Sequence, residues 1–190
     1  MRSIIKLGVF LLVVAGVAGL AISYVNGITS PIIEQQMIEN KLASFKEVYP
    51  DSDEVRDETS KYLNDSTNPV ITEVNVAYQG GSPAGVIYGV APNGYAGKIQ
   101  ILAGFDIASQ KITVIKILSL SETPGLGAKA TEPAFTDRFK DKDAASPLEV
   151  VKQEPAAGNE ILAITASTIT SKAVTDGVNA AREHFTANFK

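Results

Sequence analysis

The hydrophobic residues of this chain follow three successive patterns, and each pattern predicts a different kind of structure. The first is an uninterrupted apolar run at residues 7–25, which contains no charged side chain. The second is an alternation of apolar and polar residues that recurs between residues 70 and 119 and predicts β-strands. The third is an apolar stripe near the C-terminus with the three- and four-residue spacing of a helix.

The apolar run has the length of a membrane-spanning helix. At a rise of 1.5 Å per residue it spans roughly 28 Å, about the thickness of a bilayer's hydrocarbon core. Arg2 and Lys6 precede it, which predicts that residues 1–6 lie in the cytoplasm and that everything after the run is exported. The alternative is a signal peptide cleaved near residues 18–23, but signal h-regions are only about 7–15 residues long. We therefore expect residues 7–25 to be an uncleaved, single-pass anchor in the cell inner (cytoplasmic) membrane.

Residues 26–69 are expected to connect the anchor to a folded domain. Ser30 followed by Pro31 is typical of a helix start, with a Ser cap and Pro at the first helical position. One apolar stripe predicts that this helix packs on the domain; it consists of Ile38, Leu42, Phe45 and Tyr49. Residues 51–68 are polar and acidic, and are expected to be mobile or weakly helical.

The remaining residues, 70–190, are expected to form one α+β domain. The alternating patterns predict strands at residues 70–78, 84–91, 98–106, 111–119 and 148–152. Helical spacing predicts a short helix at residues 133–140 and an amphipathic C-terminal helix that begins near residue 170. The expected fold class is therefore α+β: one N-terminal transmembrane helix followed by a small, mostly antiparallel sheet flanked by helices.

Composition excludes several kinds of function. The chain has no Cys, which rules out disulfides, iron–sulfur clusters and Cys-ligated zinc. Its one His excludes a His-cluster metal site, so no metal-ligating residues are expected. The net charge of -4 argues against binding nucleic acid through a basic surface.

A run of hydroxyl side chains precedes the predicted C-terminal helix. Its members are Thr165, Ser167, Thr168, Thr170 and Ser171. Such residues cap helices by satisfying the free N–H groups of the first turn, and this is the simpler interpretation. The run nevertheless holds more hydroxyls than one cap needs. Because a helix N-terminus also favours an anion, a phosphate esterified to a Thr at this place would be stabilised.

A second motif reads Glu-Thr-Pro-Gly-Leu-Gly at residues 122–127. Pro124 followed by Gly125 predicts a type II turn with a positive φ at the glycine. A strand-to-helix connection would need only one glycine. The second glycine, Gly127, also suits a backbone that lies close against a flat ligand.

A third motif is the loop Gly-Tyr-Ala-Gly at residues 94–97. A Tyr in such a loop is more often a packed loop residue than a residue that stacks on a ligand ring. The loop therefore adds only a weak indication of a binding site.

Together the three motifs resemble the FMN-binding domain of the G subunit of the Rnf electron-transport complex, and of its counterpart, the C subunit of the sodium-pumping NADH:quinone reductase. The flavin-attachment pattern of this family is Asp-x-x-(Ser/Thr)-Gly-Ala-Thr. Thr165 matches its hydroxyl position and Thr168 matches its acceptor Thr. Three positions depart from the pattern, since its Asp, Gly and Ala are Leu162, Ala166 and Ser167 here. The Glu-Thr-Pro-Gly-Leu-Gly segment favours the Rnf protein over its counterpart.

The resemblance implies a cofactor and a role. FMN would be joined through its phosphate to Thr168 by a magnesium-dependent flavin transferase outside the cytoplasm. The protein would then relay electrons in an ion-translocating ferredoxin:NAD oxidoreductase complex, with other membrane subunits of the Rnf complex as partners. No residue of this chain is expected to be catalytic by itself. The expected cofactor-binding residues are Thr168, Thr165, Ser167, Thr170, Ser171, Glu122, Thr123, Gly125, Leu126, Gly127 and Tyr95.

Two alternatives remain open at this point. One is a stand-alone, membrane-anchored FMN protein that donates electrons to an extracytoplasmic reductase. The other is an exported interaction module without redox function, whose hydroxyl run only caps a helix.

Overall fold

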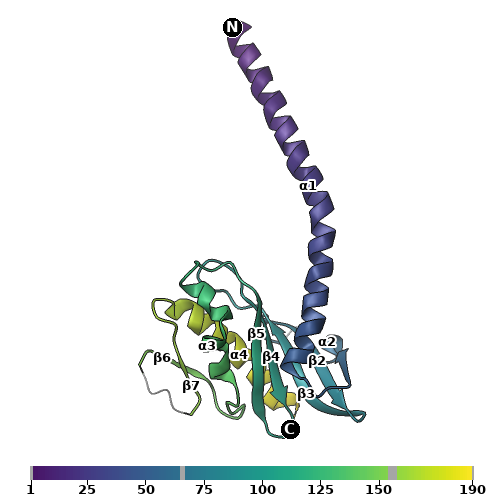
Figure 1. The fold of residues 1–190 in the computed structure, drawn as a ribbon, viewed down its shortest axis with the longest axis vertical. Coiled ribbons are helices and arrows are strands. Elements are labelled where there is room, and N and C mark those ends of the chain that lie inside the picture. The colour runs from purple at the N-terminus through teal and green to yellow at the C-terminus, as the bar shows by residue number, and fades with distance from the viewer. Residues whose placement is uncertain (1, 65–66, 154–157, 190) are drawn as a thin grey trace. The chain divides into compact units, whose positions relative to one another are not determined.

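The computed structural model (Figure 1) describes residues 2–64, 67–153 and 158–189. It divides into two units, Met1–Leu42 and Ala43–Lys190. The first consists of most of helix α1, Arg2–Val48. The most apolar 18-residue window of this helix has a mean hydropathy of 2.5, and none of it is buried, so α1 is long and apolar enough to cross a membrane.

The predicted helix start at Ser30 is wrong, because α1 continues through this position with Pro31 in its interior. Proline removes one backbone donor and so interrupts a single hydrogen bond of the helix. The hydroxyl of Thr29 donates to the carbonyl oxygen of Val25 at 3.0 Å, which supplies a local bond in the same stretch. Helical residues on both sides then continue the helix past the proline.

The second unit contains a five-stranded, wholly antiparallel sheet with strands in sequence order (Figure 1). The strands are β1 Glu54–Asp57, β2 Ile71–Gln79, β3 Ser82–Val90, β4 Gln100–Asp106 and β5 Lys111–Ser119. The predicted fold class is confirmed, and β2 to β5 lie where alternation predicted strands.

The polar segment 51–68 contains the short helix α2, Thr59–Tyr62, in line with the expected weak helicity, but also β1, which was not predicted. β1 has the sequence Glu-Val-Arg-Asp, and only its Val55 is partly buried, against the smaller core. Backbone pairing with β2 holds it at the edge of the sheet, with Arg56 opposite Val76. Such a strand carries no apolar alternation that sequence reasoning can detect.

Helices cover both faces of the sheet. The C-terminal helix α4, Thr168–Asn188, packs on the face that holds the larger core; Val86, Tyr88 and Phe105 lie there with Val178 and Phe185. The opposite face holds a smaller core in which the end of α1 packs; its buried members are Phe45, Val48, Tyr49, Ala77, Ile87 and Leu102. The predicted packing of the 38–49 stripe is confirmed for Phe45 and Tyr49, but it is wrong for Ile38 and Leu42, which are exposed.

Short elements complete the domain. The predicted helix at 133–140 appears as α3, Pro133–Thr136, followed by the 3-10 turn η2, Asp137–Phe139. A further 3-10 turn, η1, spans Gly127–Thr131. The predicted strand at 148–152 is confirmed as β6, Glu149–Val151, which pairs in parallel with a strand that was not predicted, β7, Glu160–Leu162.

Candidate functional site

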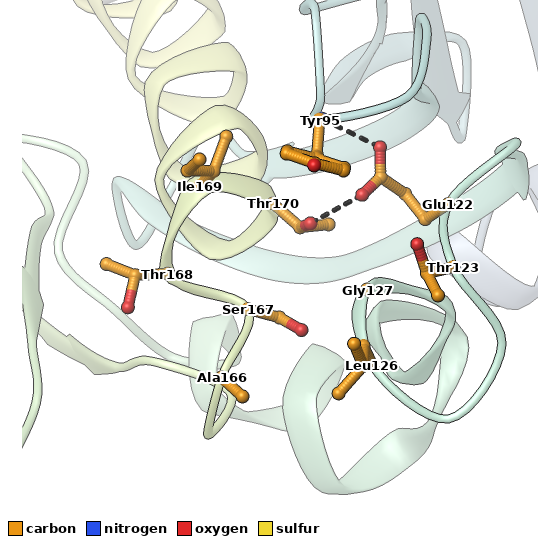
Figure 2. Close-up of a pocket in the computed structure, with 10 residues that line it drawn as sticks. All are labelled: Tyr95, Glu122, Thr123, Leu126, Gly127, Ala166, Ser167, Thr168, Ile169 and Thr170. Atoms are coloured by element: carbon orange, nitrogen blue, oxygen red, sulfur yellow. Dashed lines mark hydrogen bonds between the residues drawn. The ribbon is translucent and has the colours of Figure 1, made fainter.

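The three sequence motifs meet around one pocket of about 520 Å³ (Figure 2). The loop after β3 supplies one wall, the segment after β5 another, and the start of α4 the third. The lining residues are Tyr95, Glu122, Thr123, Leu126, Gly127, Ala166, Ser167, Thr168, Ile169 and Thr170. Segments more than 70 positions apart in the sequence therefore form one site.

The carboxylate of Glu122 joins all three walls (Figure 2). Its Oε1 accepts the backbone N–H groups of Tyr95 at 2.8 Å and Ala96 at 3.0 Å. Its Oε2 accepts the hydroxyl of Thr170 on α4 at 2.6 Å. Glu122 is only 6% exposed, and hydrogen bonds of this kind stabilise a buried carboxylate. Glu122 therefore links the loop that contains Tyr95 to the start of α4, and this set of hydrogen bonds is called the Glu122 clamp below.

Two glycines of the motifs make room for this clamp. A Cβ at Gly94 would lie 2.4 Å from Glu122 Oε1, and a Cβ at Gly127 would lie 2.5 Å from Oε2. Both distances are too short for any side chain. The sequence motif therefore needs Gly127 for close approach to the Glu122 carboxylate.

The Pro-Gly turn forms as predicted. The N–H of Leu126 donates to the carbonyl oxygen of Thr123 at 3.1 Å, and Gly125 has a φ of +76°, as a type II turn requires. Thr123 and Leu126 line the pocket, whereas Gly125 does not. A Cβ on Gly125 would meet no atom within 4 Å, so its role in this structure is the turn conformation.

The hydroxyl run divides into residues that hold the protein together and residues of the pocket. Ser171 is fully buried outside the pocket; its Oγ donates to the carbonyl oxygen of Ser167 at 3.0 Å and accepts the N–H of Ile164 at 2.9 Å. Thr170 lines the pocket but donates to Glu122. Thr165 is exposed and lines a neighbouring pocket of about 330 Å³ beside Lys129.

Ser167 and Thr168 lie at the start of α4 with different surroundings. Thr168 is the first residue of the helix, so the helix begins two residues earlier than predicted, and its side chain is half-buried. Ser167 occupies the cap position, yet its Oγ is buried and has no hydrogen-bond partner among the residues that the structure describes. Figure 2 shows the two side chains leaving the backbone in opposite directions. Ala166, just before them, has a φ of +61°, a conformation that favours glycine.

Three exposed apolar side chains border the pocket. Tyr95 is 70% exposed, Leu126 43% and Ile169 59%. Among the described residues from Ala43 onward, these are the large hydrophobic side chains that are exposed, and all three belong to this one site. Sequence reasoning missed Ile169 and Ala166. An apolar residue between the hydroxyls of Thr168 and Thr170 was the available signal for Ile169.

The pocket offers hydrogen-bonding groups and apolar surface but few charges. Among the described residues that line it, Glu122 is the one carboxylate, and its oxygens already accept bonds. No cluster of three potential metal ligands occurs within the described parts of the chain. The site therefore combines exposed apolar surface with the start of a long helix, a position that favours an anionic group.

Comparison with known families defines the class of this protein. Residues 94–183 match the model of the FMN-binding domain, which includes every wall of the pocket. Residues 1–48 match the model of the RnfG N-terminal region, which coincides with α1. The chain is thus a protein with an N-terminal apolar helix and an FMN-binding domain.

Full-length relatives define the family more closely. The chain is 37% identical over 187 residues to the G subunit of the Na(+)-translocating ferredoxin:NAD(+) oxidoreductase complex of Acetobacterium woodii, covering 94% of this chain and 89% of that protein. It is 33% identical over 170 residues to the G subunit of the proton-translocating complex of Clostridium ljungdahlii, covering 90% and 85%. The chain belongs to the family of Rnf-complex G subunits.

Solved structures of the C subunit of the Na(+)-translocating NADH-quinone reductase share the fold. The Parabacteroides distasonis protein aligns with a TM-score of 0.55 at 23% identity, over 71% of this chain and 76% of that chain. NqrC of Shewanella oneidensis aligns with a TM-score of 0.56 at 16% identity, over 76% and 86%. These likenesses support the arrangement of sheet and helices described above.

Proposed function

We propose that this chain carries FMN in the pocket at the start of α4, linked through its phosphate to Thr168, and relays electrons in a membrane-bound, ion-translocating ferredoxin:NAD oxidoreductase complex. The observation that carries the proposal is the pocket itself. It places a half-buried Thr hydroxyl on the first turn of a 21-residue helix and surrounds it with exposed apolar side chains. FMN supplies the redox chemistry when bound, because it accepts electrons singly or in pairs.

The phosphate fits the start of α4. The first N–H groups of a helix have no partner within the helix, and the helix dipole places about half a positive charge there. No Lys or Arg is among the described residues that line the pocket, so the helix start is the positive element available to an anion. An ester on the Thr168 hydroxyl would hold the phosphate beside these donors.

The flavin ring fits the apolar border. Tyr95, Leu126 and Ile169 expose large apolar surfaces that a planar ring system would cover. Burial of apolar surface contributes about 25 cal/mol per Å², so the contact would favour a ring lying in the pocket. Glu122 keeps the Tyr95 loop and α4 at a fixed separation, which orients these contacts.

Helix α1 fits the role of a membrane anchor. Its apolar window is long enough to span a bilayer, and Arg2 and Lys6 precede it. We propose a single-pass topology in the inner membrane, with residues 1–6 in the cytoplasm and the FMN domain outside. On that side a covalent link prevents loss of the cofactor, and a flavin transferase is the partner during maturation.

The attachment is tested with two variants of Thr168. The full-length chain, Thr168→Ala and Thr168→Ser are expressed together with a flavin transferase, and in-gel flavin fluorescence is measured. We expect Thr168→Ala to lose the fluorescence completely because no acceptor hydroxyl remains, and Thr168→Ser to retain part of it. Circular dichroism checks that both variants fold. Fluorescence that persists in folded Thr168→Ala would exclude Thr168 as the acceptor.

Membership of a complex is tested separately. Affinity purification of the tagged chain from its native membrane in mild detergent should recover other integral membrane subunits of an oxidoreductase complex. The relatives named above are subunits of such complexes. Recovery of a flavin-loaded chain without any membrane subunit would instead favour the stand-alone electron donor.

A further inference from the structure

The hydroxyl of Ser167 is a buried polar group for which the described residues provide no partner. The residue is only 7% exposed, and its Oγ makes no hydrogen bond within the described part of the chain. It lines the pocket at the cap position of α4, a helix of 21 residues. In Figure 2 its side chain points from the start of α4 toward the segment that contains Leu126.

This situation is unusual for a Ser at the start of a helix. A capping Ser normally accepts the N–H of the second or third helical residue. Here Ser167 has a φ of −136° and a ψ of 42°, and its side chain forms no capping bond. Ser171 instead makes two bonds at this place, to Ser167 O and from Ile164 N. A buried hydroxyl without a partner destabilises the protein, so some compensation is expected when the pocket is filled.

We infer that Ser167 is a positioning residue whose Oγ forms a hydrogen bond to a polar atom of the FMN held in the pocket. This inference rests on the proposed function, since FMN is the ligand. It concerns this chain in particular, because the attachment pattern quoted above has Ala where this sequence has Ser167. The hydroxyl is therefore an addition to the shared site that is satisfied in the loaded protein.

Two substitutions distinguish a ligand contact from a structural one. Ser167→Ala removes the unpartnered hydroxyl, and Ser171→Ala removes a buried hydroxyl of the same helix start that has two partners. Each full-length protein is prepared without and with the flavin transferase, and its mass shows whether it is loaded. Thermal unfolding then gives Tm for both forms.

The two variants should respond in opposite ways. Unloaded Ser167→Ala should unfold at or above the wild-type Tm, because an unsatisfied polar group has been removed. Unloaded Ser171→Ala should unfold about 2–4 °C lower for each kcal/mol of hydrogen bonding lost. Loading should raise the Tm of the wild type more than that of Ser167→Ala, again by about 2–4 °C. Ser171→Ala should keep the full rise.

Other outcomes overturn the inference. An equal rise in Tm for wild type and Ser167→Ala, or no rise in either, would show that the flavin does not use this hydroxyl. An unloaded Ser167→Ala as unstable as Ser171→Ala would show that the hydroxyl has a protein partner.

Failure of the proposed covalent attachment can be told apart from failure of the Ser167 contact, because mass spectrometry would then find no flavin on the wild-type protein. Titration of the unmodified chain with free FMN then tests the contact, with binding expected to be about two- to tenfold weaker for Ser167→Ala. Equal binding by the two proteins, or no binding by either, would overturn it.

Discussion

Two regions of the domain unit join its elements in contrasting ways: the place where the end of α1 packs on the sheet, and the pocket at the start of α4. In the first, glycines leave gaps that the chain itself fills. A Cβ on Gly85 would lie 2.3 Å from the Tyr49 ring, and one on Gly104 would lie 2.3 Å from Val48 Cγ1. The Tyr49 hydroxyl lies 2.8 Å from Asp106 Oδ2 and 3.0 Å from Ala84 O.

The pocket leaves apolar side chains exposed, which the first region does not. Val48 and Tyr49 are buried, whereas Tyr95, Leu126 and Ile169 are exposed around the pocket. The Tyr49 hydroxyl has partners, whereas the Ser167 hydroxyl has none within the described residues. The difference teaches that closely packed apolar side chains fix the fold, while exposed apolar groups beside an unpartnered hydroxyl indicate a place for a ligand.

Removal of the Glu122 carboxylate should cause the largest loss of stability among the variants considered. Glu122→Ala leaves the N–H groups of Tyr95 and Ala96 and the Thr170 hydroxyl without their acceptor. We expect a loss of about 3–5 kcal/mol in the free energy of unfolding, together with loss of covalent flavin. Urea unfolding of the unloaded chain measures the first, and in-gel fluorescence the second. Glu122→Gln keeps the shape and one acceptor, so it should lose less; equal losses would argue against the clamp.

A methyl group at Gly104 should destabilise the packing of the end of α1 on the sheet and leave the pocket unchanged. Gly104→Ala places its Cβ 2.3 Å from Val48 Cγ1 and 2.4 Å from Thr113 Oγ1. Overpacking of this kind costs about 1–3 kcal/mol, and flavin loading should persist because the pocket is elsewhere. Urea unfolding measures the free energy of unfolding, and flavin fluorescence measures the loading. Gly97→Ala is the control for stability, since its nearest neighbour would be 3.8 Å away. Equal stability of the two variants would refute the close packing of α1.

Asp106 should make the stability of the α1 region depend on pH. Burial opposes ionisation, but hydrogen bonds from Ser109 and Tyr49 hold the pKa of Asp106 below its ordinary value. A lowered pKa in the folded protein contributes stability above the unfolded value of about 3.9, and this contribution disappears as pH falls through the folded value. Wild type should therefore exceed Asp106→Asn in unfolding free energy at pH 6, with a smaller difference at pH 3. A difference independent of pH would contradict this role.

The smallest effect is expected at Ala166. Its φ of +61° costs a non-glycine residue about 1–2 kcal/mol, whereas glycine adopts it freely. Glycine also makes the unfolded chain more flexible, which offsets about 0.4–1 kcal/mol. Ala166→Gly should thus raise the unfolding free energy by about 0.5–1 kcal/mol, measured with urea. Ala145→Gly, in a loop outside the pocket, serves as the comparison and should not stabilise.

The sequence predicted those parts of the molecule in which local pattern and tertiary environment agree. Alternation located β2 to β5, and Pro124 with Gly125 specified the turn. β1 and β7 were not predicted. They are short strands that form by backbone pairing with a neighbouring strand, and they lack an apolar alternation of their own. The helix start predicted at Ser30 and Pro31 was wrong because an established helix tolerates one missing hydrogen bond.

The candidate site could be predicted by residue but not by role. Most expected residues do line the pocket, yet the sequence cannot show that the Thr170 and Ser171 hydroxyls are used inside the protein while that of Ser167 is not. The partner of Thr170 is Glu122, 48 positions away, which only the fold brings to α4. The partner of Ser171, Ile164, is close in sequence, but its contact depends on the conformation of the segment before the helix. Exposure of Ile169 likewise follows from the position of the helix start.

The most direct test of the central claim is peptide mass spectrometry of the chain isolated from its native membrane. Trypsin should release residues 153–172 as one peptide, because Lys152 and Lys172 bound a stretch without Lys or Arg. This peptide contains Thr165, Ser167, Thr168, Thr170 and Ser171 together. We expect it to carry the mass of one FMN less one water, with fragmentation placing the group on Thr168. An unmodified peptide, or FMN on another hydroxyl of the run, would contradict the account.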